Sequence, residues 1–252
     1  MRLHFSASSH NVARERFNQL LDLYGQHDIT DADCIVALGG DGHMLHVLHE
    51  TVAHGKPVFG LNCGRLGFLM NHFASDELIG RIKNAETAPI HPLRMEAVTA
   101  DGTQPPALAI NEVSLLRQTH NAAHIKVEVD GRHQVEELVC DGILLATPVG
   151  STAYNLSAHG PVVPLGAGLL ALTPISPFRP RRWHGALLGE YAKVTLEVLE
   201  PEFRPVSASA DSAEYRHIRT VSIEQADDIT LRLLYDQGYS LADRAIAEQF
   251  LT

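Results

Sequence analysis

The chain is poor in cysteine and in basic residues, and both shortages exclude classes of function. Its 252 residues include only three cysteines, Cys34, Cys63 and Cys140, with no C-x-x-C pair. An odd number of thiols cannot pair completely into disulfides, so we expect reduced cysteines in a reducing compartment. Twenty Lys and Arg stand against thirty Asp and Glu, a net charge of −10. This balance argues against non-specific nucleic-acid binding, which needs many cations to neutralise phosphates.

Several segments and motifs are also missing. No apolar run approaches the roughly 20 residues that cross a bilayer, and residues 1–6 read as a strand rather than a signal peptide. We therefore expect a cytoplasmic protein with no membrane and no nucleic-acid partner. The fifteen histidines form no H-E-x-x-H or other zinc-binding spacing. Since G-x-x-x-x-G-K-[ST] and G-x-S-x-G are both absent, neither a P-loop kinase nor an α/β-hydrolase is supported.

The first third of the chain alternates strand and helix patterns. Short apolar segments predict strands over residues 2–6, 34–38 and 57–61. Apolar residues at helical spacing predict helices over residues 12–24, 43–54 and 75–85. Strands in such an alternation are parallel neighbours joined by right-handed crossovers, with ligands at their carboxyl ends. The pattern predicts an α/β N-terminal domain with a parallel, Rossmann-like sheet.

From Met95 onward the pattern changes to short strands rich in Val, Ile, Leu and Thr, which predicts a β-rich, β-sandwich-like C-terminal domain. The expected strands cover residues 107–116, 124–129, 134–139, 143–146, 193–199 and 229–235. Ser240 and Asp243 form a capping-box-like pair before an apolar stripe, so we expect a C-terminal helix that packs back on the first domain. The predicted domains are residues 1–88 plus 236–252, and residues 89–235.

The strongest single motif is Gly39-Gly40-Asp41-Gly42, which follows a buried strand. Glycines let the backbone turn sharply and approach a ligand, and the following helix offers free N–H groups to phosphate. Phosphates repel a carboxylate, so Asp41 needs a task such as accepting a proton from an attacking hydroxyl or holding a metal. The alternative is an Asp that caps the helix. The position at the end of a buried strand favours the functional interpretation.

A second motif covers residues 141–157, where a buried strand runs into a turn dense in Gly, Ser and Thr. Such a turn can offer donors to a nucleotide, Tyr154 can stack on a base, and Asp141 can accept from a ribose or carboxamide. A solvated turn with Tyr154 in the core explains the composition equally well.

Two further polar features are weaker. Asn111 and Glu112 interrupt an apolar stretch, and the common explanation is a surface-facing pair on an alternating strand. Residues 62–68 follow a strand and contain Arg65, which could meet a phosphate, although a single Arg in a turn is usually only solvated.

Taken in order along the chain, these four motifs resemble the bacterial NAD kinase family, and the resemblance covers almost the whole chain. Residues 158–161, 173–177 and 240–250 resemble the same family. The Gly-Gly-Asp-Gly element alone is shared with diacylglycerol-type lipid kinases and phosphofructokinases, so it indicates only a superfamily.

The resemblance implies a nucleotide-binding transferase that moves a phosphoryl group from ATP, or polyphosphate, to the 2′-hydroxyl of the adenosine ribose of NAD. The product is NADP. A divalent cation, Mg²⁺ by expectation, would be bound with the nucleotide, and the protein would be a homodimer or homotetramer. Asp41 would be the general base. The implied substrate-binding residues are Asp41, Gly42, His46, Phe68, Asn111, Glu112, Asp141, Val149, Thr152, Ala153, Tyr154, Asn155, Leu156 and Ser157.

Some positions differ from the common family pattern, and two other functions compete. His46 lies where members vary, Val149 replaces a frequent Thr, and Ser212 follows Asp211 where Gly is common, so no role follows for Asp211. A lipid kinase would share the glycine turn but should carry a membrane-facing surface, which a charge of −10 does not suggest. A non-catalytic NAD sensor could keep Asn111, Glu112 and Tyr154 without needing Asp41.

Overall fold

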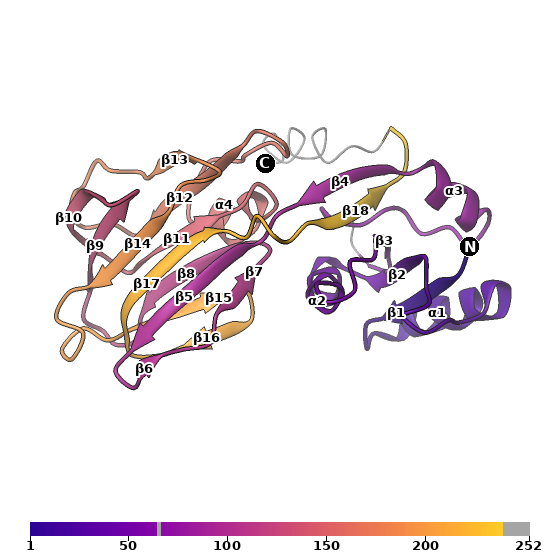
Figure 1. Ribbon diagram of the computed structural model, residues 1–252, viewed down its shortest axis with the longest axis horizontal. Coiled ribbons are helices and arrows are strands. Elements are labelled where there is room, and N and C mark those ends of the chain that lie inside the picture. Colours follow the sequence, from indigo (N-terminus) through magenta and orange to yellow (C-terminus); the bar gives the residue numbers. More distant parts are fainter. Residues whose placement is uncertain (65–66, 239–252) are drawn as a thin grey trace. The chain divides into compact units, whose positions relative to one another are not determined.

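The computed structural model describes residues 1–64 and 67–238. The described chain divides into two sheet-rich units with few helices (Figure 1). The first unit contains Met1–Ile90 together with the segment that begins at Ile229, and the second contains His91–Asp228. The C-terminal helix expected over residues 240–250 and the loop residue Arg65 lie outside the described residues.

The first unit is built on one five-stranded sheet in the order β1-β2-β3-β18-β4. Its strands are β1 (Leu3–Ala7), β2 (Cys34–Gly39), β3 (Val58–Asn62), β18 (Leu231–Tyr235) and β4 (Glu86–Ile90). Neighbours from β1 to β18 are parallel, and only β4 runs antiparallel. Its helices are α1 (Asn11–Tyr24), α2 (Asp41–Thr51) and α3 (Leu78–Asn84). The parallel pairing predicted for the first three strands is confirmed.

Burial explains why these segments became strands. Every residue of β2 and of β3 is buried, as expected of central strands with packed side chains on both faces. One apolar core joins β1, β2 and β3 to Leu20 of α1 and to Leu78 and Ile82 of α3. Met44 and Leu48 of α2 are fully buried as well. α2 begins at Asp41 rather than at residue 43, so the Asp and the last Gly of the glycine motif form its first turn.

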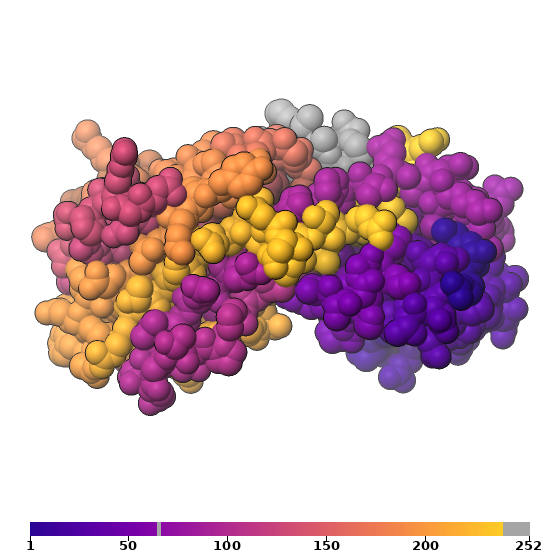
Figure 2. All heavy atoms as spheres, viewed as in Figure 1, coloured from indigo at the N-terminus to yellow at the C-terminus, as the bar shows by residue number. Residues whose placement is uncertain are grey.

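The assignment of residues 229–235 to the β-rich domain is wrong. β18 pairs with β3 and β4, and it lies beside β4 in Figures 1 and 2. Leu231, Leu233, Leu234 and Tyr235 are all buried, so this nearly continuous apolar run suits a central strand of a largely parallel sheet. The chain therefore returns to the first unit at Ile229, before the boundary predicted at residue 235.

The second unit contains two sheets around one core. The seven-stranded sheet has the order β10-β9-β14-β17-β5-β6, with β7 also paired to β5. The six-stranded sheet has the order β13-β12-β11-β8-β15-β16. The strands of the first are β5 (Leu93–Thr99), β6 (Gly102–Thr103), β7 (Ala107–Ala109), β9 (Ala123–Val129), β10 (Arg132–Cys140), β14 (Val194–Val198) and β17 (Ile218–Gln225). Those of the second are β8 (Glu112–Arg117), β11 (Gly142–Ala146), β12 (Leu169–Ile175), β13 (Ala186–Gly189), β15 (Val206–Ala210) and β16 (Ala213–Tyr215).

Alternation along the strands places the core between these two sheets, as a sandwich requires. Val113 and Leu115 of β8, with Ile143 and Leu145 of β11, join residues of the seven-stranded sheet in this core. The intervening residues of β8 and β11 therefore point to the opposite side, which we call the outer face of the six-stranded sheet. The short helices η1 (Gly150–Thr152) and α4 (Tyr154–Ser157) follow β11.

The single strand predicted over residues 107–116 is in fact two strands. β7 belongs to the seven-stranded sheet and β8 to the six-stranded sheet, so the chain crosses between sheets at Ile110 and Asn111. The polar pair Asn111-Glu112 marks this crossover rather than the exposed side of one alternating strand. Among the described residues, no helix combines the length and apolar character needed to span a membrane.

Candidate functional site

In the first unit, Asp41 lies where β2 ends and α2 begins. Gly39 is the last residue of β2, and Gly40 is the N-cap of α2, in an extended conformation and without a side-chain cap. The carboxylate of Asp41 accepts hydrogen bonds from two backbone amides, Phe68 N to Oδ2 at 2.7 Å and Leu69 N to Oδ1 at 2.9 Å. The carboxylate therefore fastens the loop after β3 instead of capping its own helix.

A glycine makes this close approach of loop and carboxylate possible. A Cβ atom built on Gly67 would lie 2.3 Å from Oδ1 of Asp41, well inside van der Waals contact. Any side chain at residue 67 would push the carboxylate away from the amides that hold it. Gly67 and Phe68, at the end of the segment that the sequence singled out, thus help to orient Asp41 together with Leu69.

A polar cavity of about 570 Å³ lies at the same edge of the sheet. Its lining comes from the segments that follow β1, β2 and β3 and from the start of α1, namely Ser8, Ser9, His10, Asn11, Val12, Gly39, Gly40, Cys63 and Gly64. Neither α1 nor α2 has a side-chain cap, so the first N–H groups of both helices remain available to an anion. The arrangement suits a phosphorylated ligand.

The cavity wall at residues 62–64 is fixed by hydrogen bonds from outside it. Arg16 of α1 donates Nη1 to the carbonyl oxygen of Asn62 at 2.6 Å, and its guanidinium lies over the ring of Phe73. The side chain of Asn62 in turn binds both backbone groups of Gly64. Burial raises the pKa of Cys63, which favours the protonated thiol over the nucleophilic thiolate.

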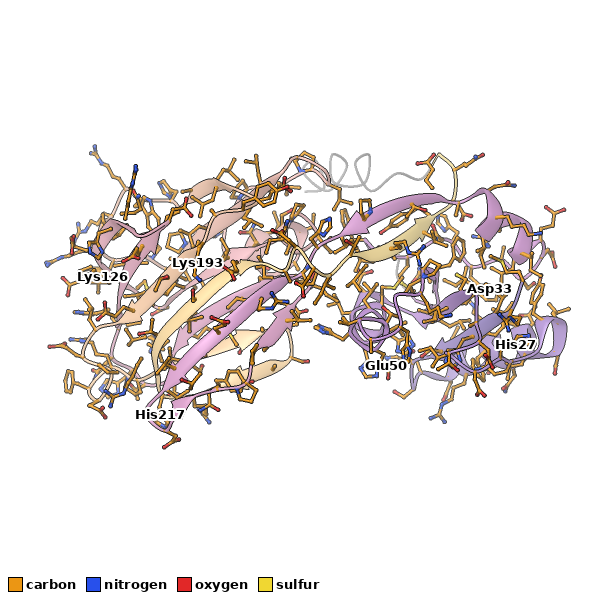
Figure 3. The ribbon with its side chains drawn as sticks, viewed as in Figure 1. His27, Asp33, Glu50, Lys126, Lys193 and His217 are labelled. Atoms are coloured by element: carbon orange, nitrogen blue, oxygen red, sulfur yellow. The ribbon has the colours of Figure 1, made fainter. Side chains whose placement is uncertain are left out.

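Two predicted ligands on α2 are directed to solvent. His46 is exposed and pairs with Glu50, labelled in Figure 3, across 3.3 Å on the same helix. Gly42 is exposed, and a Cβ atom built on it would meet nothing within 4 Å. Ligand roles for both residues stay predictions.

In the second unit, Asp211 organises the crossover at residues 110–112. Its carboxylate accepts the backbone amides of Ile110 at 2.7 Å, Asn111 at 3.0 Å and Glu112 at 3.4 Å. Asp211 occupies the turn between β15 and β16 with a φ of 46°, a left-handed conformation that Asp tolerates better than most residues. The sequence interpretation assigned it no role. The sequence feature that could have indicated a role for Asp211 was an Asp in a short turn between two alternating strands.

Thr147 joins the crossover to the loop that follows β11. Its amide donates to the carbonyl oxygen of Asn111 at 2.9 Å, and its hydroxyl donates to that of Ile110 at 2.7 Å. Gly150 packs against the same backbone, since a Cβ atom there would lie 2.1 Å from the Asn111 oxygen. Two polar motifs that are distant in sequence therefore form one rigid assembly.

Several predicted binding residues in residues 149–157 use their polar groups internally. Asn155 is fully buried, accepts from the Thr173 hydroxyl at 2.6 Å, and donates to the carbonyl oxygens of Ser151 and Pro161. Val149 is buried and accepts from the Thr152 hydroxyl at 3.3 Å. These contacts shape the loop.

The remaining residues of this stretch offer backbone or exposed groups. Ala153 provides the carbonyl oxygen that Leu156 N binds at 3.1 Å, Leu156 is half-buried, and Ser157 is exposed. Direct ligand contacts by the residues from Val149 to Ser157 stay predictions.

Tyr154 and Glu112 share the outer face of the six-stranded sheet, and Asp141 is close enough to act electrostatically on Tyr154. Tyr154 packs there against Leu144 and Ala146 of β11. Burial raises the pKa of Tyr154, and the negative charges of Glu112 and Asp141 raise it further. Asp141 directly precedes β11, and Thr147 directly follows it, so the strand separates the two residues by about 20 Å. Oδ1 of Asp141 accepts a hydrogen bond from Nε of Arg117 at 2.6 Å. Tyr154 is thus within electrostatic reach of carboxylates from both ends of β11.

Glu112 is the most perturbed acid of this face. Burial, and secondly the charge of Asp211, raises the pKa of Glu112 to about 7. Its Oε2 is buried and has no hydrogen-bond partner among the described residues. A buried acceptor without a donor is costly, so this oxygen is a natural acceptor for a ligand hydroxyl.

The raised pKa of Glu112 predicts how folding stability depends on pH. The carboxyl ionises near pH 4.5 in the unfolded chain and near pH 7 in the folded one, so folding stability falls as pH rises between these values. We compare the free energy of unfolding of Glu112→Gln with that of wild type at each pH. The difference, mutant minus wild type, should be about 1–3 kcal/mol larger at pH 8 than at pH 4. Urea unfolding of both proteins at the two pH values measures this. Glu136→Gln, at an exposed position of β10, should show no such difference. An equal effect at both pH values for Glu112→Gln would contradict the prediction.

Comparisons with known proteins agree over both units. Residues 2–84 match the family described as ATP-NAD kinase N-terminal domain, and residues 110–183 match the ATP-NAD kinase C-terminal domain. The chain is 55% identical over 250 residues to an NAD kinase of Hyphomonas neptunium, covering 99% of this chain and 98% of that protein. It is 53% identical over 248 residues to an NAD kinase of Rhizobium meliloti, covering 98% and 96%.

Two solved structures have a similar fold. A yeast NADH kinase complexed with NADH gives a TM-score of 0.84 at 19% identity, covering 98% of this chain and 86% of that one. An Archaeoglobus fulgidus NAD kinase in complex with ATP gives 0.78 at 24% identity, covering 98% of each chain. At these identities the likeness concerns the fold alone.

Proposed function

Since the chain belongs to the NAD kinase family and transfers a phosphoryl group to NAD, we propose how its own residues carry that reaction. The description of the family as ATP-NAD kinase supports ATP rather than polyphosphate as the donor in this proposal. The acceptor is the 2′-hydroxyl of the adenosine ribose, and the products are NADP and ADP. The Gly-Gly-Asp-Gly motif alone is compatible with a lipid kinase, and the NAD-binding motifs alone are compatible with a sensor. Membership of the NAD kinase family favours the kinase over both alternatives.

Asp41 is the general base in this proposal, and the orientation of its carboxylate is the observation that supports the role. Each oxygen accepts one backbone N–H, which leaves each a second lone pair for a ribose hydroxyl. The two amides fix the direction of those lone pairs without neutralising the charge. As the hydroxyl oxygen bonds to the γ-phosphorus, its proton passes to Asp41, and the bond from the γ-phosphorus to ADP breaks.

The cavity at the starts of α1 and α2 binds the phosphates of ATP in this proposal. Gly39 and Gly40 line it directly before Asp41 in sequence, so the base is next to the phosphate-binding backbone. Backbone N–H groups of the two uncapped helices supply positive potential in a chain whose net charge is −10.

The divalent cation enters as part of the ATP substrate in this proposal. Within the described residues, no three His, Cys, Asp or Glu side chains are grouped closely enough to hold a metal ion. Mg²⁺ favours phosphate oxygens and water with one or two carboxylates, which fits delivery with the nucleotide. Its chemistry is to neutralise charge on the transferred phosphoryl group.

The test of this function is a coupled assay. The purified protein is incubated with NAD, ATP and Mg²⁺, and NADP is detected with an NADP-specific dehydrogenase. We expect NADP formation to depend on both substrates. Diacylglycerol offered in place of NAD should remain unphosphorylated. Binding of NAD without NADP formation would return the chain to the sensor interpretation. Light scattering on the same preparation tests the expected homodimer or homotetramer.

Asn111 and Glu112 should act in NAD binding rather than in chemistry. Replacing either by Ala is expected to raise KM for NAD on the order of 10-fold, since a charge-assisted hydrogen bond contributes about 1.5–3 kcal/mol. KM for ATP should change little, and steady-state kinetics with each substrate varied measures both. Asn121→Ala, at a half-buried Asn of the same unit whose side chain donates to the carbonyl oxygen of Phe203, is the matched control. An unchanged KM for NAD in both site variants would leave these residues with a structural role only.

A further inference from the structure

We propose that Asp211 is a positioning residue for NAD, which holds Asn111 and Glu112 in the conformation that binds the dinucleotide. This inference rests on the proposed function of those two residues. Asp211 itself needs no contact with NAD, because its carboxylate acts on the backbone that carries them.

The crossover needs such a support because the sheets do not supply one. Ile110 and Asn111 lie between β7 and β8, where the chain leaves one sheet and enters the other. Their amides have no partner in a strand ladder, and an unpaired buried amide costs roughly 1–3 kcal/mol. One carboxylate from the β15–β16 turn satisfies these amides and that of Glu112 together.

The turn brings Asp211 to this place by strand register. β15 pairs with β8 so that Ala210 stands opposite Val113, and the turn therefore begins beside the start of β8. The amide of Asp211 also donates to the carbonyl oxygen of Glu112 at 3.3 Å. The backbone of Glu112 is held by hydrogen bonds in both directions, while its Oε2 has no hydrogen-bond partner within residues 1–64 and 67–238.

Asp211 also acts on the charge of Glu112. The ionisable groups that act on this carboxyl are Asp211 from the β15–β16 turn and Tyr154 from α4. The Asp211 charge disfavours a second negative charge, so it helps to raise the pKa of Glu112 to about 7. An ionised Glu112 accepts ribose hydroxyls better than a protonated one. KM for NAD in wild type should therefore fall as pH rises through 7.

Two substitutions distinguish the effect of the Asp211 carboxylate from that of the backbone conformation of the turn. Asp211→Gly keeps the left-handed backbone conformation and removes all three hydrogen bonds. Asp211→Asn keeps one accepting oxygen and removes the charge. Asp130 is the matched control, because it also has a positive φ, lies in a turn between strands of this unit, and accepts the amide of Lys193, labelled in Figure 3.

We expect Asp211→Gly to raise KM for NAD on the order of 10-fold with KM for ATP within about twofold. Asp211→Asn should shift the pH midpoint of KM for NAD downward. Glu112→Gln should abolish the pH dependence in both backgrounds. Asp130→Gly and Asp130→Asn should change neither quantity. All assays are run below the thermal midpoint of each variant.

Two results would overturn the inference in an active enzyme. One is a KM for NAD in Asp211→Gly no higher than in Asp130→Gly. The other is a KM for NAD in Asp211→Asn equal to that in Asp130→Asn together with an unshifted pH midpoint, a result that can be obtained even if Asp211→Gly does not fold. Failure of the proposed function would be recognised separately, because the wild-type protein itself would then form no NADP.

Discussion

Asp41→Asn is expected to lower kcat roughly 10²–10⁴-fold while NAD still binds, because positioned acid–base catalysis contributes about that much. The amide has the size of the carboxylate but cannot take the proton of the ribose hydroxyl. Its oxygen can still accept one amide of the loop, and its NH₂ group then faces the other. That mismatch costs about 1–3 kcal/mol, so the thermal midpoint should also fall by several degrees. Steady-state kinetics, NAD binding by calorimetry and thermal melting measure the three quantities.

The matched control for this substitution is Asp33→Asn. Asp33, labelled in Figure 3, is in the same unit and accepts the backbone amide of Arg2 at 2.7 Å, away from the cavity. Its replacement should leave kcat within twofold of wild type. If Asp41→Asn kept more than about a third of wild-type kcat, Asp41 would not be the base. If NAD binding disappeared together with activity, Asp41 would be a ribose ligand.

Chelation of divalent metal is the second large effect, and we expect excess EDTA to abolish NADP formation. The reaction brings the negative charges of a triphosphate and a dinucleotide close together. The described residues contain no cluster of side chains that could hold a metal ion to neutralise these charges. Excess Mg²⁺ should restore full activity. Because the metal belongs to the substrate, EDTA should leave the thermal midpoint of the free protein unchanged. Full turnover in EDTA, or a metal that survives dialysis against it, would contradict this account.

What the sequence predicts well is local. The buried run of β2, the glycine turn after it and the parallel pairing of β1, β2 and β3 follow from residues close together in the chain. These features depend on side-chain burial and on turn chemistry, which a short window of sequence contains. The position of Asp41 at a carboxyl edge of the sheet could therefore be predicted.

What the sequence predicts poorly depends on contacts between distant segments. The amides that orient Asp41 come from Phe68 and Leu69, and those that Asp211 binds lie about a hundred residues before it in the sequence. An Asp in a turn forms the same local pattern whether it meets solvent or another loop. Likewise, an apolar segment such as residues 107–116 gives no indication of where it leaves one sheet for another.

The position of β18 has a consequence for the order in which the protein can fold during synthesis. β18 lies between β3 and β4, yet it emerges from the ribosome only after the whole second unit. Until then β4 has no strand beside it in the first sheet, and β3 exposes an unpaired edge. The second unit is continuous in sequence and can complete both of its sheets earlier. We therefore expect the nascent chain to finish its later-encoded unit first, and the Asp41 unit to close last.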